Sequence, residues 1–222
     1  MRRRDFLNLA AAAPLALSCA NAATPAALRI LAFGDSLTAG FGLPKDEGFV
    51  PALSRWVAER QSLPVSFRNA GLSGDTTYGG RIRIGWALRR PADAVMVQLG
   101  ANDMLLGLSP AAAARNLDAI LDAAGKGGRP LLVLAIHAIG NDAYRARWDA
   151  IWPELANRHG ALLVPDLYAT IRAQPKEARA AYLQTDGLHA SPRGVATMVA
   201  LAGPMVLRLI RRADARRSTG KG

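Results

Sequence analysis

Short apolar runs alternate along this chain with longer segments in which apolar residues recur every three or four positions. Apolar runs of four to six residues bounded by glycine or polar residues indicate buried strands, and the longer patterns indicate amphipathic helices. Five strands are predicted, at residues 28–33, 65–68, 94–99, 131–136 and 161–164. Five main helices are predicted between and after them, at residues 49–61, 81–90, 111–124, 144–158 and 192–212.

Strands that alternate with helices favour a mostly parallel sheet with helices on both faces. We therefore predict an α/β fold of three layers, α/β/α, built around a five-stranded sheet. Ligands of such sheets lie beyond the carboxyl ends of the strands. Gly34, Gly71 and Gly100 stand at or just after the ends of predicted strands, so the functional residues are expected beside these three glycines.

The first 22 residues have the pattern of an export signal. Three arginines at 2–4 precede an apolar run at 9–17, and Ala-Asn-Ala at 20–22 forms a small-x-small cleavage site. The apolar run is shorter than the ~20 residues that span a bilayer. Residues 3–7 resemble a twin-arginine signal, and an ordinary secretory signal with an extra arginine is the alternative. We expect a periplasmic or secreted protein.

The remaining chain is expected to form one domain without disulfides. Cys19 is the only cysteine, and cleavage after residue 22 would remove it together with any thiol chemistry. Acylation of Cys19 in a lipoprotein is the alternative. A chain of 222 residues suits a single domain. We place that domain at residues 23–212 and expect a basic, disordered tail at residues 213–222.

The charge is strongly basic, with a formal net charge of +11 at pH 7. Much of this surplus lies between residues 208 and 221. A basic protein can bind nucleic acids or anionic membranes. No nucleic-acid-binding motif accompanies the charge. We therefore expect no nucleic-acid partner, a solvated basic face and, at most, weak contact with a membrane surface.

Four polar segments follow predicted strands, and each supplies one part of an acyl-transfer site. Ser36, in Gly-Asp-Ser-Leu after the first strand, offers a hydroxyl nucleophile, although a serine there is more often a turn or capping residue. Gly71 lets an anion approach the backbone N–H closely. Asn102 offers a side-chain amide at a strand end. Asp186 and His189 offer a base with its orienting carboxylate three residues earlier.

These four segments, in this order, resemble the sequence signature of the GDSL/SGNH hydrolases. The resemblance runs from about residue 28 to about residue 209. Residues 37–44 and 69–77 look closest to the bacterial thioesterase I, lysophospholipase and arylesterase subgroup. The resemblance implies a flavodoxin-like SGNH hydrolase fold and a serine esterase that needs neither cofactor nor metal. Its substrate would be a small-molecule ester or a lipid.

The resemblance also implies a role for each residue. Ser36 would attack the acyl carbonyl, His189 would accept and pass on the proton, and Asp186 would orient His189. The N–H groups of Ser36 and Gly71 and the side chain of Asn102 would bind the oxyanion. Acyl or aryl esters and thioesters are the expected substrates. A lysophospholipase, a carbohydrate deacetylase and a non-catalytic binding protein are the alternatives, and the complete set of five residues argues against the last.

Several residues near the expected site depart from the pattern of that subgroup. After His189 comes Ala190-Ser191-Pro192 where the subgroup has an immediate proline. Met104, Leu105 and Leu106 stand where the subgroup often carries glycine and arginine, and they either line an acyl-chain groove or belong to the core. His137 stands where the subgroup usually has no histidine, and we favour a structural or rim role for it over substrate contact. These departures bear on substrate preference and leave the reaction class unchanged.

Overall fold

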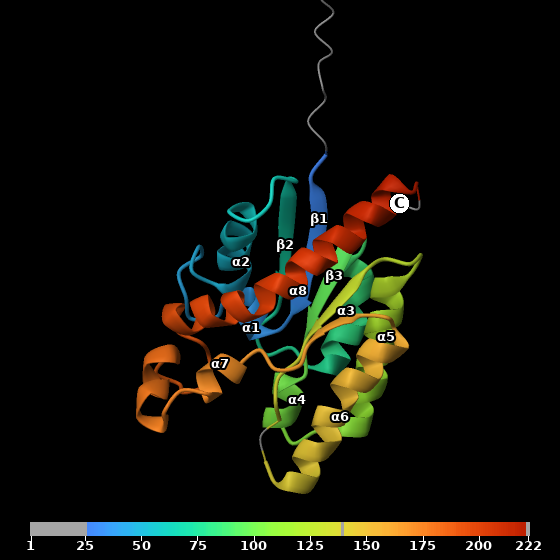
Figure 1. The fold of residues 1–222 in the computed structure, drawn as a ribbon. Coiled ribbons are helices and arrows are strands. Elements are labelled where there is room, and N and C mark those ends of the chain that lie inside the picture. The colour runs from blue at the N-terminus through green and yellow to red at the C-terminus, as the bar shows by residue number, and fades with distance from the viewer. Residues whose placement is uncertain (1–25, 139, 221–222) are drawn as a thin grey trace, which may run out of the picture.

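One five-stranded sheet forms the centre of the protein (Figure 1). The computed structural model describes residues 26–138 and 140–220, so the predicted export signal and Cys19 lie outside the described residues. The strands are parallel and lie in the order β2-β1-β3-β4-β5. They are β1 (Leu28–Gly34), β2 (Val65–Gly71), β3 (Ala94–Gln98), β4 (Leu131–Leu134) and β5 (Leu162–Val164). The predicted five-stranded parallel sheet is confirmed.

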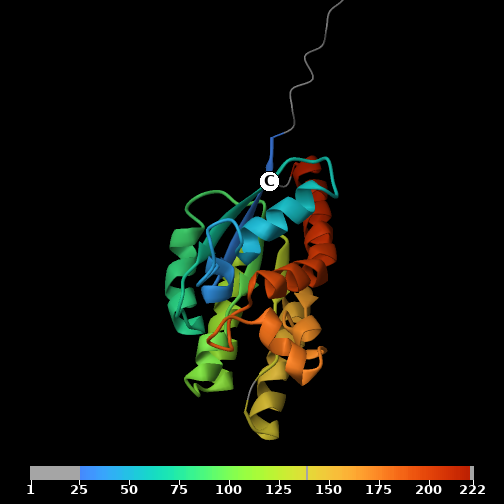
Figure 2. The same ribbon diagram turned by 90° about the vertical axis from the view of Figure 1, so that its left-hand side faces the viewer.

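Helices cover both faces of this sheet, which confirms the predicted three layers. The long helices are α2 (Phe49–Ala58), α3 (Thr77–Ala87), α5 (Pro110–Gly125), α6 (Asp142–Arg158) and α8 (Pro192–Ser218). Figure 2 shows α3 on one side of the strands and α8 on the other. Short helices missing from the prediction are α1 (Ser36–Ala39), α4 (Ala101–Leu105), α7 (Ala169–Arg172) and the 3₁₀ helix η1 (Lys176–Tyr182).

Alternate residues of the strands supply two separate cores, because successive side chains point to opposite faces of a sheet. Ile30 and Ala32 of β1 pack in the core beneath α2 and α8. Leu31 and Phe33 pack in the core beneath α3, α5 and α6. The central strands are therefore buried on both faces, which explains why they are continuous apolar runs in the sequence.

Helix α8 is longer than predicted, and this corrects the expected disordered tail over residues 213–218, while residues 221–222 of that tail lie outside the described residues. The helix continues to Ser218 instead of ending near residue 212. The apolar spacing of the helix continues too, since Leu209, Ile210 and Ala213 are all buried. Arg216 donates a hydrogen bond to the carbonyl of Gly127 at 2.9 Å. Residues 213–218 are thus the last turns of a core helix, and their basic side chains contact neighbouring loops.

Among the described residues, α8 alone is long and apolar enough to cross a membrane by length and composition. Half of that apolar stretch is buried inside the protein. Val199, Ala202 and Val206 along it belong to the core beneath α2 and α8. The apolar character of α8 is therefore accounted for by its packing on the sheet.

Candidate active site

Ser36 stands directly beyond the carboxyl end of the central strand β1. Asp35 caps the short helix α1, because its Oδ1 accepts a hydrogen bond from the N–H of Leu37 at 3.1 Å. Ser36 is the first residue of that helix, so its own N–H has no partner inside the helix. A Cβ at position 34 would overlap the Thr38 side chain, so only glycine fits the tight exit from the strand.

A buried polar network lies beneath Ser36. Asp35 is fully buried, and its Oδ2 accepts a hydrogen bond from Gln98 Nε2 at 3.1 Å. Thr38 Oγ1 in turn donates to Gln98 Oε1 at 3.0 Å. Burial of Asp35 raises the pKa of its carboxyl group to about 7, although hydrogen bonds from Leu37 and Gln98 oppose the shift. This network joins α1 to the end of β3 and fixes the backbone that carries Ser36.

His189 reaches Ser36 from a loop near the other end of the chain. His189 Nε2 lies 2.8 Å from Ser36 Oγ, and His189 Nδ1 lies 2.6 Å from Asp186 Oδ2. Gly187 adopts a left-handed conformation, with φ of 69°, and allows the tight turn between the two residues. Ser191 then caps helix α8 by accepting a hydrogen bond from the N–H of Gly194, as predicted.

Asp186 is held as a charged group. Its second oxygen, Oδ1, accepts hydrogen bonds from the N–H groups of Leu188 and His189 at 2.9 and 3.0 Å. The contact with the His189 side chain is the largest cause of a fall in the pKa of Asp186 to about 2, and the two backbone donors add to it. Asp186 is therefore ionised at any neutral pH and favours the proton on Nδ1 of His189.

Three side chains hold the histidine loop in place. The ring of Phe41 packs against the imidazole of His189, with ring centres 4.7 Å apart. The hydroxyl of Tyr168 donates to the carbonyl of Leu188 at 2.8 Å. Gln184 Nε2 donates to the carbonyl of Phe41 at 2.8 Å and so ties the loop to the segment after α1.

Asn102 lies across the pocket from the histidine loop, on the second residue of helix α4. Gly100 precedes this helix with φ of 117°, a conformation that favours glycine. One N–H of the Asn102 side chain donates to the carbonyl of Asp75 at 2.8 Å. Because an amide carries two such protons, the second is available to a ligand in the pocket.

The structure brings Gly74, and not the predicted Gly71, to the pocket. The N–H of Gly71 donates to Asn69 Oδ1 at 2.9 Å, and a Cβ at position 71 would overlap the backbone of Ala39. Gly71 is therefore a packing glycine beneath α1. Gly74 lies three residues further on, lines the pocket and has φ of 80° with open space around it. Within the described residues, the N–H of Gly74 donates no hydrogen bond.

Arg83 is a second residue that the sequence did not single out. Its guanidinium donates to the carbonyls of Gly34 and Ala70 at 2.6 and 2.7 Å and to Asp75 Oδ2 at 2.6 Å. It thereby ties the ends of β1 and β2 to the turn that carries Gly74. The side chain is largely buried against the ring of Phe33. An arginine one helical turn after a glycine-rich loop gives no sequence signal for this role.

The pocket in front of Ser36 has a volume of about 560 Å³. Ser36, Gly74, Asn102 and His189 line one end of it. Apolar side chains line much of the rest, namely Leu37, Phe41, Met104, Leu105, Ile136, Ile171, Leu183 and Leu188. Of the residues that depart from the subgroup, Met104 and Leu105 thus line the pocket, while Leu106 is exposed outside it.

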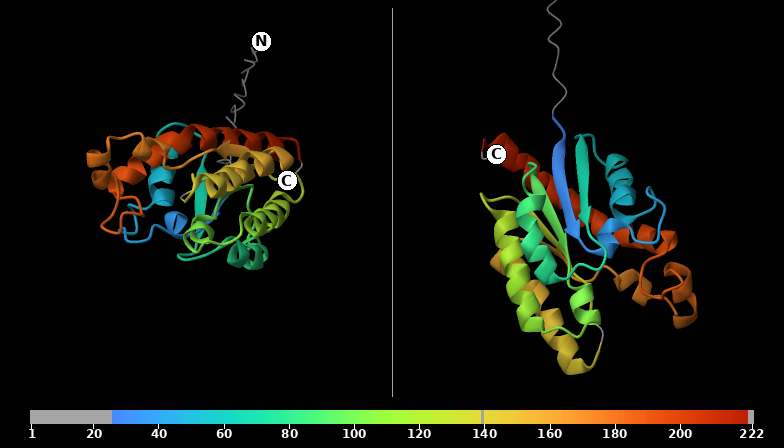
Figure 3. Two further views of the ribbon diagram at one scale, coloured as in Figure 1. Left: turned by 90° about the horizontal axis from the view of Figure 1, so that it is seen from below. Right: turned by 180° about the vertical axis from the view of Figure 1, so that it is seen from behind.

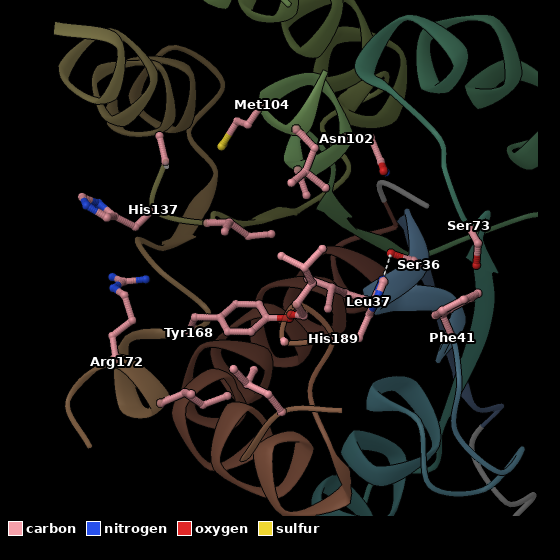
Figure 4. Close-up of a pocket in the computed structure, with 18 of the residues that line it drawn as sticks. Ser36, Leu37, Phe41, Ser73, Asn102, Met104, His137, Tyr168, Arg172 and His189 are labelled. Atoms are coloured by element: carbon pink, nitrogen blue, oxygen red, sulfur yellow. Dashed lines mark hydrogen bonds between the residues drawn. The ribbon is translucent and has the colours of Figure 1, made fainter. Parts of the chain in front are cut away.

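His137 lies on the far rim of this pocket. Figure 4 shows His137 and Arg172 on the opposite side of the pocket from Ser36 and His189. His137 Nδ1 contacts Asp149 Oδ2 at 2.8 Å, and Arg172 pairs with Asp166. The location agrees with the rim role that we favoured for His137. Within residues 26–138 and 140–220, no three His, Cys, Asp or Glu side chains are grouped so as to hold a metal ion.

Comparison with known proteins places this geometry in a family. A model of the GDSL-like lipase/acylhydrolase family matches residues 32–196. An arylesterase of Vibrio mimicus is 29% identical over 177 residues, which are 78% of this chain and 86% of that protein. Thioesterase 1/protease 1/lysophospholipase L1 of Escherichia coli (strain K12) is 31% identical over 74% of this chain and 76% of its own length.

Solved structures agree with these sequence matches. The crystal structure of TesA superposes with a TM-score of 0.74 at 26% identity, over 82% of this chain and 99% of that one. The structure of AlinE4, an SGNH-hydrolase family esterase, superposes with a TM-score of 0.67 at 35% identity, over 82% and 96%. The predicted resemblance and fold are therefore confirmed, and the chain belongs to the GDSL-like lipase/acylhydrolase family of ester-hydrolysing enzymes.

Proposed function

We propose that Ser36 is the nucleophile of this esterase, with His189 as its base and Asp186 as the carboxylate that orients the base. The observation that carries the proposal is the chain of contacts from Ser36 Oγ through His189 to Asp186, at 2.8 and 2.6 Å. A serine hydroxyl is a weak nucleophile until an adjacent base accepts its proton. His189 Nε2 lies within the distance that this proton transfer requires.

The reaction has two halves. Ser36 Oγ attacks the acyl carbon while its proton passes to His189 Nε2, and the tetrahedral intermediate then loses the alcohol or thiol, which takes that proton. The acyl group is now esterified to Ser36. Water attacks it with His189 again as the base, and the acid is released while the proton returns to Ser36. Asp186 remains ionised throughout, because its pKa is about 2, and it stabilises the imidazolium.

The oxyanion would be bound by three N–H groups around Ser36. These are the backbone N–H of Ser36, the second side-chain N–H of Asn102 and the backbone N–H of Gly74, which replaces the predicted Gly71. Two observations support Gly74: it lines the same pocket as Ser36 and Asn102, and the Asn102 side chain bonds to the adjacent residue Asp75. Fixed donors around developing negative charge are among the largest contributions to such catalysis.

The substrate would be a carboxylic ester or thioester with an apolar acyl or aryl part. The support is the apolar lining beside Ser36, where Leu37, Met104 and Leu105 lie. A carbohydrate deacetylase would need polar side chains there for the sugar hydroxyls. A lysophospholipase is compatible with the same lining and stays the second candidate, since its acyl chain is apolar too.

The place of action that we propose is the periplasm or the extracellular space. The support is the arginine-rich start, the apolar run and the small-x-small site within residues 1–22. A mass measurement on the protein recovered from the periplasm would test it, because cleavage after residue 22 removes a defined mass. Recovery only from the cytoplasm with residues 1–22 intact would contradict the proposal.

Labelling with a fluorophosphonate tests the nucleophile directly. We expect wild-type protein to take up one label at Ser36 and the Ser36→Ala variant to take up none. Ser73 lines the same pocket and is exposed, so Ser73→Ala is the matched control and should label normally. Labelling of Ser36→Ala at the wild-type rate would reject the assignment. A panel of p-nitrophenyl esters, acyl-CoAs, lysophospholipids and acetylated sugars then ranks the substrate classes.

A further inference from the structure

Helix α3 presents a row of exposed apolar side chains. Tyr78, Ile82 and Trp86 follow one another at intervals of four residues, so they lie along one side of the helix. Their exposed fractions are 63, 67 and 68%. Figure 3 shows in its right panel that α3 lies on the outer surface of the protein on that side. None of these three side chains lines the catalytic pocket, so catalysis does not explain why they are apolar and exposed.

Arginines surround this row. Arg81, Arg89 and Arg90 are exposed on α3 or just after it, and residues 76–92 contain no Asp or Glu. Arg68 reaches over from β2 and donates to the carbonyls of Ala87 and Arg90 at 2.8 and 3.1 Å. Burial is the main cause that lowers the pKa of Arg68 from its ordinary value, and the nearby charge of Arg90 adds to it. We call Tyr78, Arg81, Ile82, Trp86, Arg89 and Arg90 the α3 face.

We propose that the α3 face docks the protein on an anionic phospholipid surface. Tyr and Trp side chains favour the boundary between headgroups and acyl chains, because one part of each ring is apolar and the other is a hydrogen-bond donor. Ile82 between them would enter the apolar side of that boundary. Arginine guanidinium groups bind phosphate oxygens at two points. Apolar and aromatic side chains beside basic ones are the combination by which surface helices bind anionic membrane interfaces.

A second copy of this chain fits the α3 face less well than a lipid surface does. Symmetric dimers place the same patch of both subunits against each other. The exposed arginines at 81, 89 and 90 would then face arginines of the other copy, with no acidic residue of 76–92 to separate them. Like charges brought together in this way disfavour association. An anionic lipid surface offers the complementary charge.

Docking on this face would bring lipid to the mouth of the catalytic pocket. Helix α3 begins directly after the turn at residues 72–75, whose Ser73 and Gly74 line the pocket. Leu72 in that turn is 54% exposed and adds an apolar side chain next to Ser73 in the chain. Only this consequence depends on the proposed esterase function, since membrane binding itself requires no catalysis.

Vesicle binding tests the proposal. Wild-type protein is compared with Ile82→Glu/Trp86→Glu and Arg89→Ala/Arg90→Ala, all carrying the same N-terminal segment, on phosphatidylglycerol/phosphatidylcholine vesicles and on pure phosphatidylcholine vesicles. We expect wild-type protein to prefer the anionic vesicles. The glutamate variant should lose binding at least about tenfold, and each arginine removed should cost about fivefold. Arg208→Ala/Arg211→Ala, on exposed positions of α8, removes the same charge from another face and should bind normally.

Trp86 also provides a local probe. Brominated phosphatidylcholine in the anionic vesicles should quench the fluorescence of Trp86. Trp148 and Trp152 are buried, and Trp56 is partly buried against the core beneath α2 and α8. Trp86→Phe should keep the affinity and lose most of this quenching. Hydrolysis of a soluble p-nitrophenyl ester should be unchanged in all four variants, which shows that they are folded.

Three results would overturn the proposal. The first is equal vesicle binding by wild-type protein and Ile82→Glu/Trp86→Glu. The second is an absence of Trp86 quenching in vesicles that bind the protein. The third is a dimer of the wild-type protein in analytical ultracentrifugation that Trp86→Glu converts to a monomer, which would make the α3 face an interface between copies. A failure of esterase activity alone would affect only the function proposed for the pocket.

Discussion

Two carboxylates flank Ser36, and their surroundings push them in opposite directions. Asp186 lies on an exposed loop, accepts three hydrogen bonds and has its pKa lowered to about 2. Asp35, next to Ser36 in the chain, is fully buried and has its pKa raised to about 7. At neutral pH the same chemical group is thus fully ionised on one side of the serine and only partly ionised on the other.

The difference lies in what each carboxylate must do. A charge that stabilises an imidazolium works best where donors keep it ionised at every working pH. A carboxylate that caps a helix beneath the nucleophile needs only hydrogen bonds, and these survive partial protonation. In the proposed mechanism the exposed loop supplies the proton transfer, and the buried network supplies the position of Ser36.

The largest effect is expected from Asp186→Asn. An amide can hold His189 in the wrong tautomer and cannot stabilise its charge, so kcat should fall by about 10⁴-fold. Thermal unfolding should change little, because Asp186 is on the surface. Hydrolysis of p-nitrophenyl butyrate measures the first effect and calorimetry the second. An Asp186→Asn enzyme that kept a tenth of the wild-type kcat would remove Asp186 from the proposed mechanism.

Asn102→Ala should have the next largest effect, on the side of the pocket that neither carboxylate occupies. The loss of one oxyanion donor typically lowers kcat by about 10²–10³-fold. The shape of the pH–rate profile should stay as in wild-type protein, since proton transfer by His189 is untouched. Steady-state kinetics from pH 5 to 9 give both quantities. A change in KM alone would mean that Asn102 binds substrate and does not stabilise the intermediate.

Asp35→Asn tests the raised pKa of the buried carboxyl group through the pH dependence of the free energy of unfolding. In the folded protein Asp35 holds its proton up to about pH 7, and in the unfolded chain only up to about pH 4. Protonated Asp35 therefore stabilises the fold, and this contribution falls as pH rises from about 4 to about 7. Urea unfolding measures the free energy of unfolding of Asp35→Asn and of wild-type protein at each pH. The value for the variant minus the value for wild-type protein should rise by about 2–3 kcal/mol from pH 5 to pH 8. An equal difference at both pH values would contradict the raised pKa.

Phe41→Leu should produce the smallest effect. The Phe41 ring packs on His189 with centres 4.7 Å apart and is half exposed. An aromatic face stabilises an adjacent cation by about 0.5–1 kcal/mol at an exposed site, so kcat should fall about two- to fivefold. Phe41→Tyr is the conservative control and should restore most of the rate. Equal rates for leucine, tyrosine and phenylalanine at this position would limit Phe41 to holding the loop.

The strands and long helices could be predicted because their patterns arise within each segment. Buried parallel strands are short apolar runs, and the capping pair Ser191-Pro192 marks the start of α8. The short helices α1, α4 and α7 were missed, since four or five residues hold too little pattern and tertiary contacts stabilise them. The predicted end of α8 was wrong because the basic residues near the end concealed a continuing apolar spacing at Leu209, Ile210 and Ala213.

Most residues of the candidate site could be predicted from sequence segments, but the glycine beside Ser36 could not. Ser36, Asn102, Asp186 and His189 stand in recognisable segments, and the structure brings all four to one pocket or its edge. Gly71 and Gly74 lie in one glycine-containing segment, and composition alone does not tell a packing glycine from one that faces a ligand. The overlap that a side chain would cause at Gly71, and the open space at Gly74, exist only in three dimensions.

The serine and the histidine of the site stand 153 residues apart in the chain. During synthesis, the ribosome delivers the first of them long before the second. His189 also immediately precedes the cap of α8, whose packing on the sheet anchors one end of its loop. A chain that is still growing therefore cannot cleave esters by this chemistry. Hydrolysis begins only after Ser36, His189 and α8 have all been made, so catalytic activity reports that these distant parts of the domain have folded together.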